Sequence, residues 1–178
     1  MPRGSRGPLA SGCQAVHSLP MAVRLEPYTE ADFEAWLAEA VPAYALDHVV
    51  DGTWSPAHAL ELSREAHAGL LPQGVATPGH AFLRILAEGH DEAVGFLWWA
   101  ETESAGEPGA YVYGLGIHEE ARRRGYGTAA LAELERIARA RGLRYVCLHV
   151  FGHNAQARRL YEQIGFSPTN ITLRKNLS

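Results

Sequence analysis

The sequence predicts an α/β fold in which helices flank a mixed, mostly antiparallel central sheet. The first observation is size: the chain has 178 residues, 47% hydrophobic and 20% charged, which suits one domain with its own core. The second is that apolar runs of strand length and helical repeats both occur along it. The third is their order, because three consecutive strand-like runs favour antiparallel neighbours, whereas later runs are separated by helices.

The first third of the chain predicts one strand and two helices. Alternating apolar and charged residues predict a short strand over 21–27, ended by its proline. A helix is expected to start at Thr29 and to be interrupted at Pro42. The pair Ser55-Pro56 is typical of a helix N-cap and first helical residue, so a second helix is expected from Ser55 until Pro72 stops it.

The rest of the chain predicts a three-stranded meander followed by alternating helices and strands. Turn-rich connections separate the first runs, which favours hairpins, and the later helices end at glycines. In order, these elements are strands Ala81–Ala87, Ala93–Ala100 and Gly109–Ile117, a helix Thr128–Ala140, a strand Leu143–Val150, a helix Ala155–Ile164 and a last strand Ile171–Leu173.

Charge is unevenly distributed along the chain, although the net charge is only -4. Residues 1–120 carry 17 acidic and 5 basic side chains, whereas residues 121–178 carry 3 acidic and 11 basic ones. All bases but Lys175 are arginines, whose planar guanidinium groups suit phosphates and carboxylates. Such an asymmetry is typical of a site for a charged ligand, and also of a solvated basic helix face.

Composition argues against several classes of protein. No run approaches the roughly 18 apolar residues of a membrane span, so no membrane partner is expected. Cys13 and Cys147 are too few for a disulfide framework, which predicts a cytoplasmic protein. Cys147, His149 and His153 have a metal-ligand spacing but no fourth ligand nearby, so no metal is expected.

The strongest local motif is the stretch Arg122 to Thr128, which follows a predicted strand and opens a predicted helix. Glycines let the backbone approach a ligand closely, and the free N–H groups of a first helical turn favour an anion. The motif therefore predicts a pyrophosphate site, the alternative being a tight turn with solvated arginines. A P-loop is excluded because no lysine follows the second glycine. A dinucleotide fold would need an acid near 145–151, and none is there.

Two motifs together resemble the Gcn5-related N-acetyltransferase (GNAT) family, in particular a bacterial subgroup of it. The first is matched by Ile117, Arg122, Gly125 and Gly127, and the second by Asn154, Ala157, Tyr161, Gly165 and Phe166. The resemblance covers Ala22 to Leu177, so residues 21–178 are expected to form one GNAT domain. Residues 1–20 are expected to be a disordered leader or the remnant of a cleaved tag.

The resemblance implies that acetyl-CoA lies in a splayed gap between the fourth and fifth strands, here Gly109–Ile117 and Leu143–Val150. The pantetheine arm would pair with the fourth strand, the pyrophosphate would lie on the glycine-containing turn, and Tyr161 would protonate the leaving thiolate as general acid. The implied cofactor-binding residues are Leu115, Gly116, Ile117, Arg122, Arg123, Arg124, Gly125, Tyr126, Gly127, Thr128, Asn154, Ala157 and Tyr161.

The general base is where this sequence departs from the family. Many relatives carry carboxylates at positions that align with Gly114 and Gly116. We expect the two glycines to open room beside the thioester for a larger acceptor or a relay water. His149 is the candidate base or proton relay, with His118, Glu101 and Glu103 as alternatives.

The expected function is transfer of an acetyl group from acetyl-CoA to a primary amine by direct attack. No nucleophile with a paired base is visible, so no covalent enzyme intermediate is expected. The acidic first half would suit a cationic small-molecule or peptide amine. No nucleic-acid partner is expected, and a homodimer is one expected assembly. The alternative is a non-catalytic acyl-CoA binding or sensing module.

Overall fold

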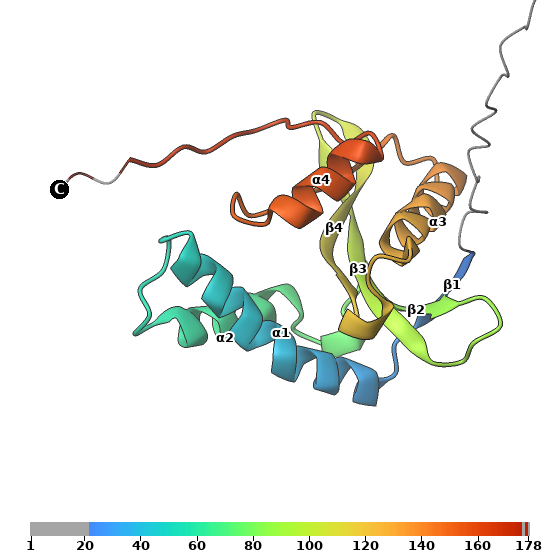
Figure 1. Cartoon of the computed structure of the whole chain (residues 1–178), viewed down its shortest axis with the longest axis horizontal. Coiled ribbons are helices and arrows are strands. Elements are labelled where there is room, and N and C mark those ends of the chain that lie inside the picture. The colour runs from blue at the N-terminus through green and yellow to red at the C-terminus, as the bar shows by residue number, and fades with distance from the viewer. Residues whose placement is uncertain (1–21, 176, 178) are drawn as a thin grey trace, which may run out of the picture.

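The structure is a computed structural model that describes residues 22–175 and 177; the leader expected over 1–20 lies outside the described residues. Among the residues described, no helix combines the length and the apolar character that a membrane span requires. The elements follow one another as β1 (Val23–Pro27), α1 (Glu30–Val50), α2 (Ala59–Leu70), β2 (His80–Ala87), β3 (Ala93–Ser104), β4 (Glu107–Ile117), α3 (Tyr126–Ala140), β5 (Tyr145–Leu148) and α4 (Ala155–Gln163) (Figure 1).

The five strands form one sheet in the order β1-β2-β3-β4-β5. Neighbours are antiparallel from β1 to β4: α1 and α2 connect β1 to β2, and short turns connect β2, β3 and β4. The strands β4 and β5 are parallel because α3 carries the chain back between them. This confirms the predicted mixed, mostly antiparallel sheet with flanking helices.

The strands β4 and β5 diverge part of the way along their length. Their register runs only from Gly109 opposite Tyr145 to Val112 opposite Leu148. On its other side β4 continues to Ile117, paired with β3. Beyond Val112, the edge of β4 that faces β5 therefore has no strand partner among the described residues, as expected for a splay between the fourth and fifth strands.

A β-bulge in β4 decides which side chains face which layer of helices. Trp98 lies opposite Gly114 and Trp99 opposite Val112, so Tyr113 is the extra residue. Trp98 stacks on Tyr113 on the face covered by α1 and α2, and Trp99 is buried on the α3 face. The two tryptophans thus face opposite sides, as the strand pattern predicts, and the bulge places Gly114 on the same face as Tyr113.

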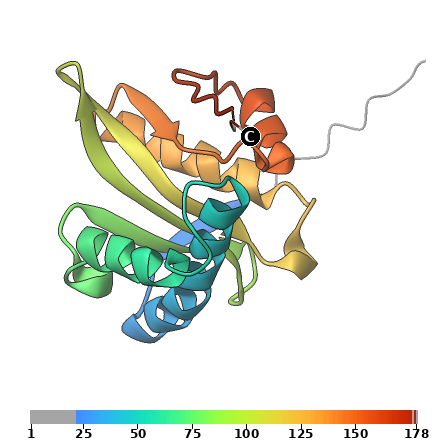
Figure 2. The same cartoon turned by 90° about the vertical axis from the view of Figure 1, so that its left-hand side faces the viewer.

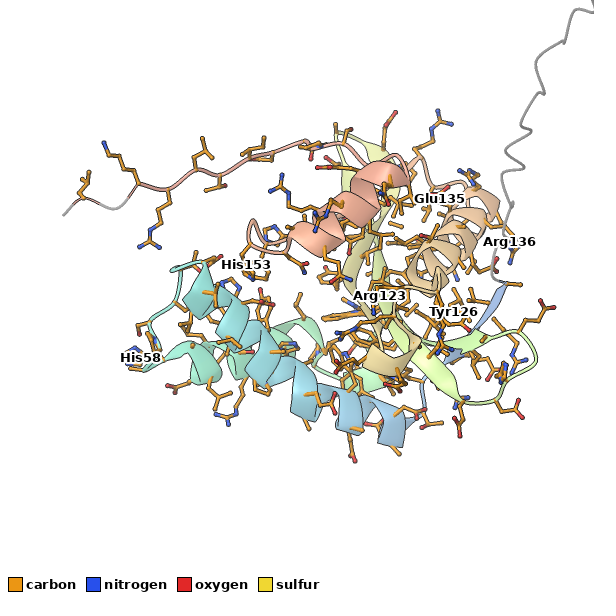
Figure 3. The ribbon with its side chains drawn as sticks, viewed as in Figure 1. His58, Arg123, Tyr126, Glu135, Arg136 and His153 are labelled. Carbon is orange, nitrogen blue, oxygen red and sulfur yellow. The ribbon has the colours of Figure 1, made fainter. Side chains whose placement is uncertain are left out.

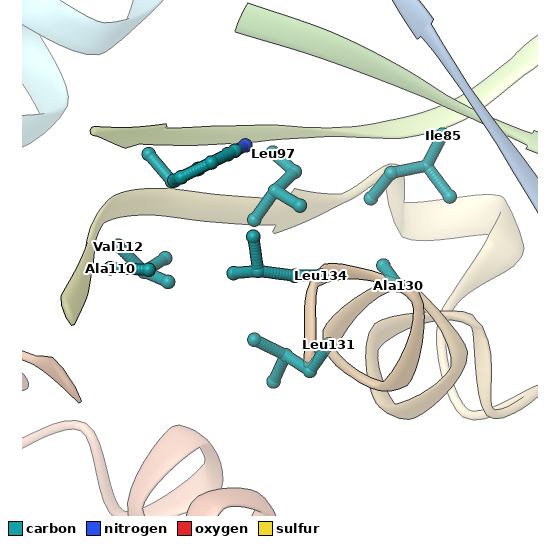
Figure 4. Packing of buried hydrophobic residues seen from close by; sticks show 8 residues of the cluster. Ile85, Leu97, Ala110, Val112, Ala130, Leu131 and Leu134 are labelled. Carbon is teal, nitrogen blue, oxygen red and sulfur yellow. The ribbon is translucent and has the colours of Figure 1, made fainter. Parts of the chain in front are cut away.

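Helices cover both faces of the sheet, α1 and α2 on one side and α3 with α4 on the other (Figure 2). The larger core lies between the sheet and α3, and Tyr161 and Ile164 of α4 pack against it. On the opposite face Phe33, Phe82 and Trp98 form the core beneath α1 and α2. Figure 4 shows the members of the larger core, which are Ile85, Leu97, Trp99, Ala110, Val112, Ala130, Leu131 and Leu134.

The predicted interruption at Pro42 is wrong, because α1 runs through this residue to Val50. A proline inside a helix costs about 3 kcal/mol, since it removes a backbone hydrogen bond and crowds the preceding turn. Two features offset that cost. Thr29 and Asp32 form a reciprocal capping box at the start of the helix. Phe33 and Ala45 are buried on either side of the proline.

Two further predictions are wrong, the start of α2 and the last strand. The helix α2 begins at Ala59, because the Ser55 hydroxyl meets His58 Nδ1 at 3.1 Å and caps no helical amide. The strand expected over Ile171–Leu173 is absent: Ile171 is 71% exposed, Leu173 is 89% exposed, and no strand of the described chain lies beside them. A strand pattern produces a strand only where a neighbour supplies hydrogen bonds.

Candidate functional site

The turn between β4 and α3 leaves the first amides of a long helix without partners. Gly125 is the N-cap of α3, with φ 86°, a conformation that glycine adopts without strain. Ala129 N donates to Gly125 O, so the amides of Tyr126, Gly127 and Thr128 precede the first intrahelical bond. No side chain caps this end. These N–H groups and the positive end of the helix dipole suit an anion.

The three arginines before this turn have different surroundings. Arg122 Nε donates to Ile117 O at 3.0 Å and thereby ties the turn to the end of β4. Arg123 has φ 60°, which is unusual for a residue with a Cβ. Arg123 and Arg124 are exposed, whereas the side chain of Tyr126, labelled with Arg123 in Figure 3, is buried. Tyr126 therefore offers a ligand its backbone only.

Further along α3, basic side chains are paired with acids of the same helix. Arg136 and Glu133 approach to 2.7 Å, and so do Arg139 and Glu135 (Figure 3 labels Glu135 and Arg136). These exposed pairs are ordinary helix-surface ion pairs. Of the basic side chains from Arg122 to Arg139, those at the turn before α3, Arg122, Arg123 and Arg124, form no ion pair among the described residues.

The unpaired edge of β4 leads to this turn. Leu115 lies opposite Leu97 of β3 and Gly116 opposite Phe96, so one edge of β4 is satisfied by β3. The other edge, from Tyr113 to Ile117, faces the divergence from β5. An extended amide-containing ligand binds such an edge as an added strand.

The first turns of α4 bring Asn154 and Tyr161 to the other side of the same divergence. Asn154 is the N-cap of α4, and its Oδ1 accepts a hydrogen bond from Ala157 N at 3.1 Å. The amide NH₂ of Asn154 stays available for a ligand. Tyr161 packs against the larger core, and burial raises the pKa of its hydroxyl above the usual value of about 10. Tyr161 is therefore protonated at neutral pH, as a general acid must be.

The expected open space at Gly114 and Gly116 is filled by the ring of Phe96. A Cβ added at Gly114 would lie 3.0 Å from Phe96 Cε2, and one added at Gly116 would overlap Phe96 Cε1. The prediction that the glycines open room is therefore wrong. An aromatic ring from β3 replaces the volume that side chains on β4 would occupy.

The structure separates the four predicted base candidates. Glu101 pairs with Arg141 at 3.0 Å near the β3–β4 hairpin, and Glu103 lies closer still to that hairpin, away from the divergence. His118 follows the end of β4, at the start of the connection to α3. His149 follows β5 where the two strands separate, and it is exposed. Of these four, His149 alone lies beside the divergence.

A cluster of aromatic rings that the sequence analysis missed links α1 to the chain after β5. We call it the aromatic cluster; it comprises Tyr44, His48, Trp54, His149, Phe151 and His153. His153, labelled in Figure 3, donates from Nε2 to Asp47 at 3.0 Å across the gap to α1. The available signal was the density of rings between 44 and 54, in a stretch that the expected break at Pro42 obscured. Within 22–175 and 177, no three His, Cys, Asp or Glu side chains are placed to hold a metal ion.

Comparison with known proteins places these features in a family. Residues 46–166 match the model of the Acetyltransferase (GNAT) family. The chain is 38% identical to YycN of Bacillus subtilis (strain 168), named an uncharacterized N-acetyltransferase, over 88% of this chain and all of that protein. A crystal structure of YycN superposes with a TM-score of 0.83 at 36% identity, covering 88% of this chain and 99% of that one.

Two other proteins share either a part of their length or only the fold with this chain. The chain is 38% identical to the mycothiol acetyltransferase of Thermobispora bispora over 84% of its own length, but it spans about half of that protein (48%). An aminoglycoside N-acetyltransferase in complex with CoA shares the fold, with a TM-score of 0.55 at 15% identity over 90% of this chain and 97% of that one. The match to the family model and the identity to YycN together show that the chain belongs to the GNAT family of acetyltransferases.

Proposed function

We propose that the protein transfers the acetyl group of acetyl-CoA to a primary amine by direct attack. The observation that carries this proposal is the succession of two binding features: β4, whose edge toward β5 is open, is followed by the turn that ends at the uncapped N-terminus of α3. A ligand that is a chain of amides at one end and a pyrophosphate at the other matches both.

Each part of acetyl-CoA would contact a different part of this surface. The pantetheine amides hydrogen-bond to the backbone of Leu115, Gly116 and Ile117, and the NH₂ of Asn154 adds a donor beside Ala157. The pyrophosphate accepts hydrogen bonds from the first amides of α3, with charge from the adjacent arginines. The residues of that turn are Arg122, Arg123, Arg124, Gly125, Tyr126, Gly127 and Thr128.

The reaction needs a base on the amine side and an acid on the thiol side. A backbone N–H near Ile117 stabilises the oxyanion, and the hydroxyl of Tyr161 gives its proton to the departing thiolate. The raised pKa of Tyr161 keeps that proton in place at neutral pH. His149, which follows β5 beside the divergence, is one candidate for the base or proton relay.

The acceptor that suits this surface is a cationic amine. The first 120 residues, which supply α1 and α2, hold most of the acids, and Asp47 and Asp51 lie at the end of α1 nearest the aromatic cluster. The mycothiol acetyltransferase relatives add their own acceptor to the compounds to try. A homodimer and a cytoplasmic location stay predictions.

An assay of CoA release tests the proposal. The full chain is given acetyl-CoA and a panel of polyamines, aminoglycosides and lysine peptides, and free thiol is measured while calorimetry follows CoA binding. We expect amine-dependent thiol release that Tyr161→Phe lowers by about 100-fold or more without loss of CoA binding. Tight CoA binding with no amine-dependent release would instead support the acyl-CoA sensing alternative.

A further inference from the structure

His48 lies at the centre of the aromatic cluster, between the end of α1 and the chain after β5. Its ring stacks on Trp54, with centroids 3.9 Å apart, and Tyr44 meets it edge-on at 4.5 Å. Phe151 also meets His48 edge-on, at 5.1 Å, and it contacts His149 in the same manner at 5.1 Å. The ring of Phe151 therefore connects His48 to the point where β4 and β5 diverge.

Hydrogen bonds after α1 determine which nitrogen of His48 carries the proton. The hydroxyl of Thr53 lies 2.6 Å from both Asp51 Oδ1 and His48 Nδ1. A hydroxyl has one proton, and the carboxylate is the stronger acceptor, so Thr53 donates to Asp51. The lowered pKa of Asp51, caused first by this bond from Thr53, agrees. Nδ1–H of His48 must then donate to Thr53, which leaves the lone pair of the neutral ring on Nε2.

The lone pair on Nε2 of His48 accepts no hydrogen bond in the described part of the chain. Nε2 of His48 is shielded from solvent and has no hydrogen-bond partner among the residues described. An unpaired buried acceptor costs about 1–3 kcal/mol. Burial is also the main reason that the pKa of His48 is lowered, so the ring is neutral at pH 7. The fold thus holds a proton acceptor in its neutral form, oriented by Thr53 and Asp51.

Other groups near the divergence are less suited to this task. Phe96 covers Gly114 and Gly116, so β4 offers no side chain there. His149 is exposed, and no side chain among the described residues hydrogen-bonds to it, so its tautomer is not fixed. The chain contains a carboxylate–hydroxyl–imidazole arrangement at the end of α1, formed by Asp51, Thr53 and His48. The base candidates expected from the sequence all lie at other positions.

We propose that Nε2 of His48 accepts the proton of the substrate amine, once the ring of Phe151 has moved aside. This inference rests on the proposed acetyl transfer. As the nitrogen of a neutral amine bonds to the thioester carbon, it becomes strongly acidic, and one N–H proton passes to Nε2. The C–S bond breaks, and the thiolate takes the proton of Tyr161. Water then takes the proton from His48 and returns one to Tyr161, so charges and atoms balance.

The charged and titratable groups around His48 favour this exchange. Asp51, through Thr53, and Asp47 on α1 stabilise the imidazolium form, and they raise the pKa that burial lowers. His149 lies near enough to lower that pKa, and His153 pairs with Asp47. Acidification therefore removes activity as His48 gains a proton, below its ordinary pKa of about 6.5.

The pH dependence of kcat/KM tests the proposal. An amine with pKa about 10.4 makes log kcat/KM fall with a slope of one as pH decreases, and protonation of His48 adds a second unit of slope below about pH 6.5. We expect His48→Gln to lose the second unit of slope, to lower kcat/KM at pH 8 by about 100-fold or more, and to bind CoA as before. Imidazole added to His48→Ala should restore part of the rate.

Two variants and one spectroscopic measurement make the test independent of folding. Thr53→Val removes the oxygen that orients Nδ1 and should also lower kcat/KM, whereas His90→Gln changes an exposed histidine in the turn between β2 and β3 and should change nothing. In an NMR titration, His48 should lose its proton below the ordinary histidine pKa of about 6.5.

The outcomes separate the two proposals. If the wild type turns over and His48→Gln keeps the slope of two, or if His48 titrates above the ordinary histidine pKa of about 6.5, the role of His48 is wrong while acetyl transfer stands. If the wild type binds CoA but releases none with any amine, acetyl transfer fails, and the role of His48 fails with it.

Discussion

Single residues at the candidate site are constrained by side chains that touch them from other strands. Gly116 is the clearest case, because the Phe96 ring of β3 occupies the place of its Cβ. Tyr161 is another, since the core that buries it also raises the pKa of its hydroxyl. The chemistry available at a position thus depends on the residue opposite it as much as on the residue itself.

Restoring a carboxylate on β4 is therefore expected to destabilise the fold rather than repair the active site. Gly116→Glu should lower the free energy of unfolding by about 1–3 kcal/mol, the usual cost of overpacking, measured by urea denaturation. Adding Phe96→Ala to it should recover part of the loss. Gly152→Ala is the control, because its Cβ would meet no atom within 4 Å. An undiminished stability of Gly116→Glu would show that Phe96 moves freely.

At the scale of elements, α1 shows how end capping and packing override a helix breaker. Its capping box joins Thr29 and Asp32 by reciprocal hydrogen bonds. The hydrogen bonds from Thr29 lower the pKa of Asp32. Ser55, which the sequence suggests as a cap for α2, makes no such bond to a helical amide.

Removal of the Thr29 cap should destabilise the fold, whereas removal of the Ser55 hydroxyl should not. Thr29→Ala is expected to cost about 1 kcal/mol of stability, whereas Ser55→Ala should change it by less than about 0.5 kcal/mol. Because the pKa of Asp32 is lowered in the folded state, its contribution is present above the unfolded pKa of about 3.9 and is lost as pH falls through the folded value. Thermal unfolding at pH 7 and pH 3 checks both points; equal effects of the two variants would contradict the assignment.

At the scale of the whole molecule, the arginines of the basic second half of the sequence differ in whether they form ion pairs. Arg136 and Arg139 on α3 pair with Glu133 and Glu135, whereas Arg122, Arg123 and Arg124 at the turn before that helix form no ion pair among the described residues. Arg124→Gln should weaken CoA binding about fivefold, corresponding to about 1 kcal/mol, and more so at low salt. Arg136→Gln should leave the dissociation constant unchanged. Equal changes in the dissociation constant for the two variants, measured by calorimetry, would mean that CoA binding depends on the overall charge of the protein.

Much of the fold and part of the site follow from local patterns in the sequence. The order of strands and helices and the glycine-containing turn at Gly125 depend on residues within a few positions of one another, so their spacing predicts them. The splay of β4 from β5 follows from the family resemblance. The aromatic cluster does not follow from spacing, because it joins residues near 48 with residues near 151.

The sequence by itself determined the class of fold and the family, since turns, caps and amphipathic repeats act over short stretches of chain. Only the tertiary structure decided that α1 continues past Pro42, that Phe96 fills the space at Gly116 and that His48 meets Phe151. These features depend on close packing between residues that are far apart in the sequence, and local sequence patterns do not predict such contacts.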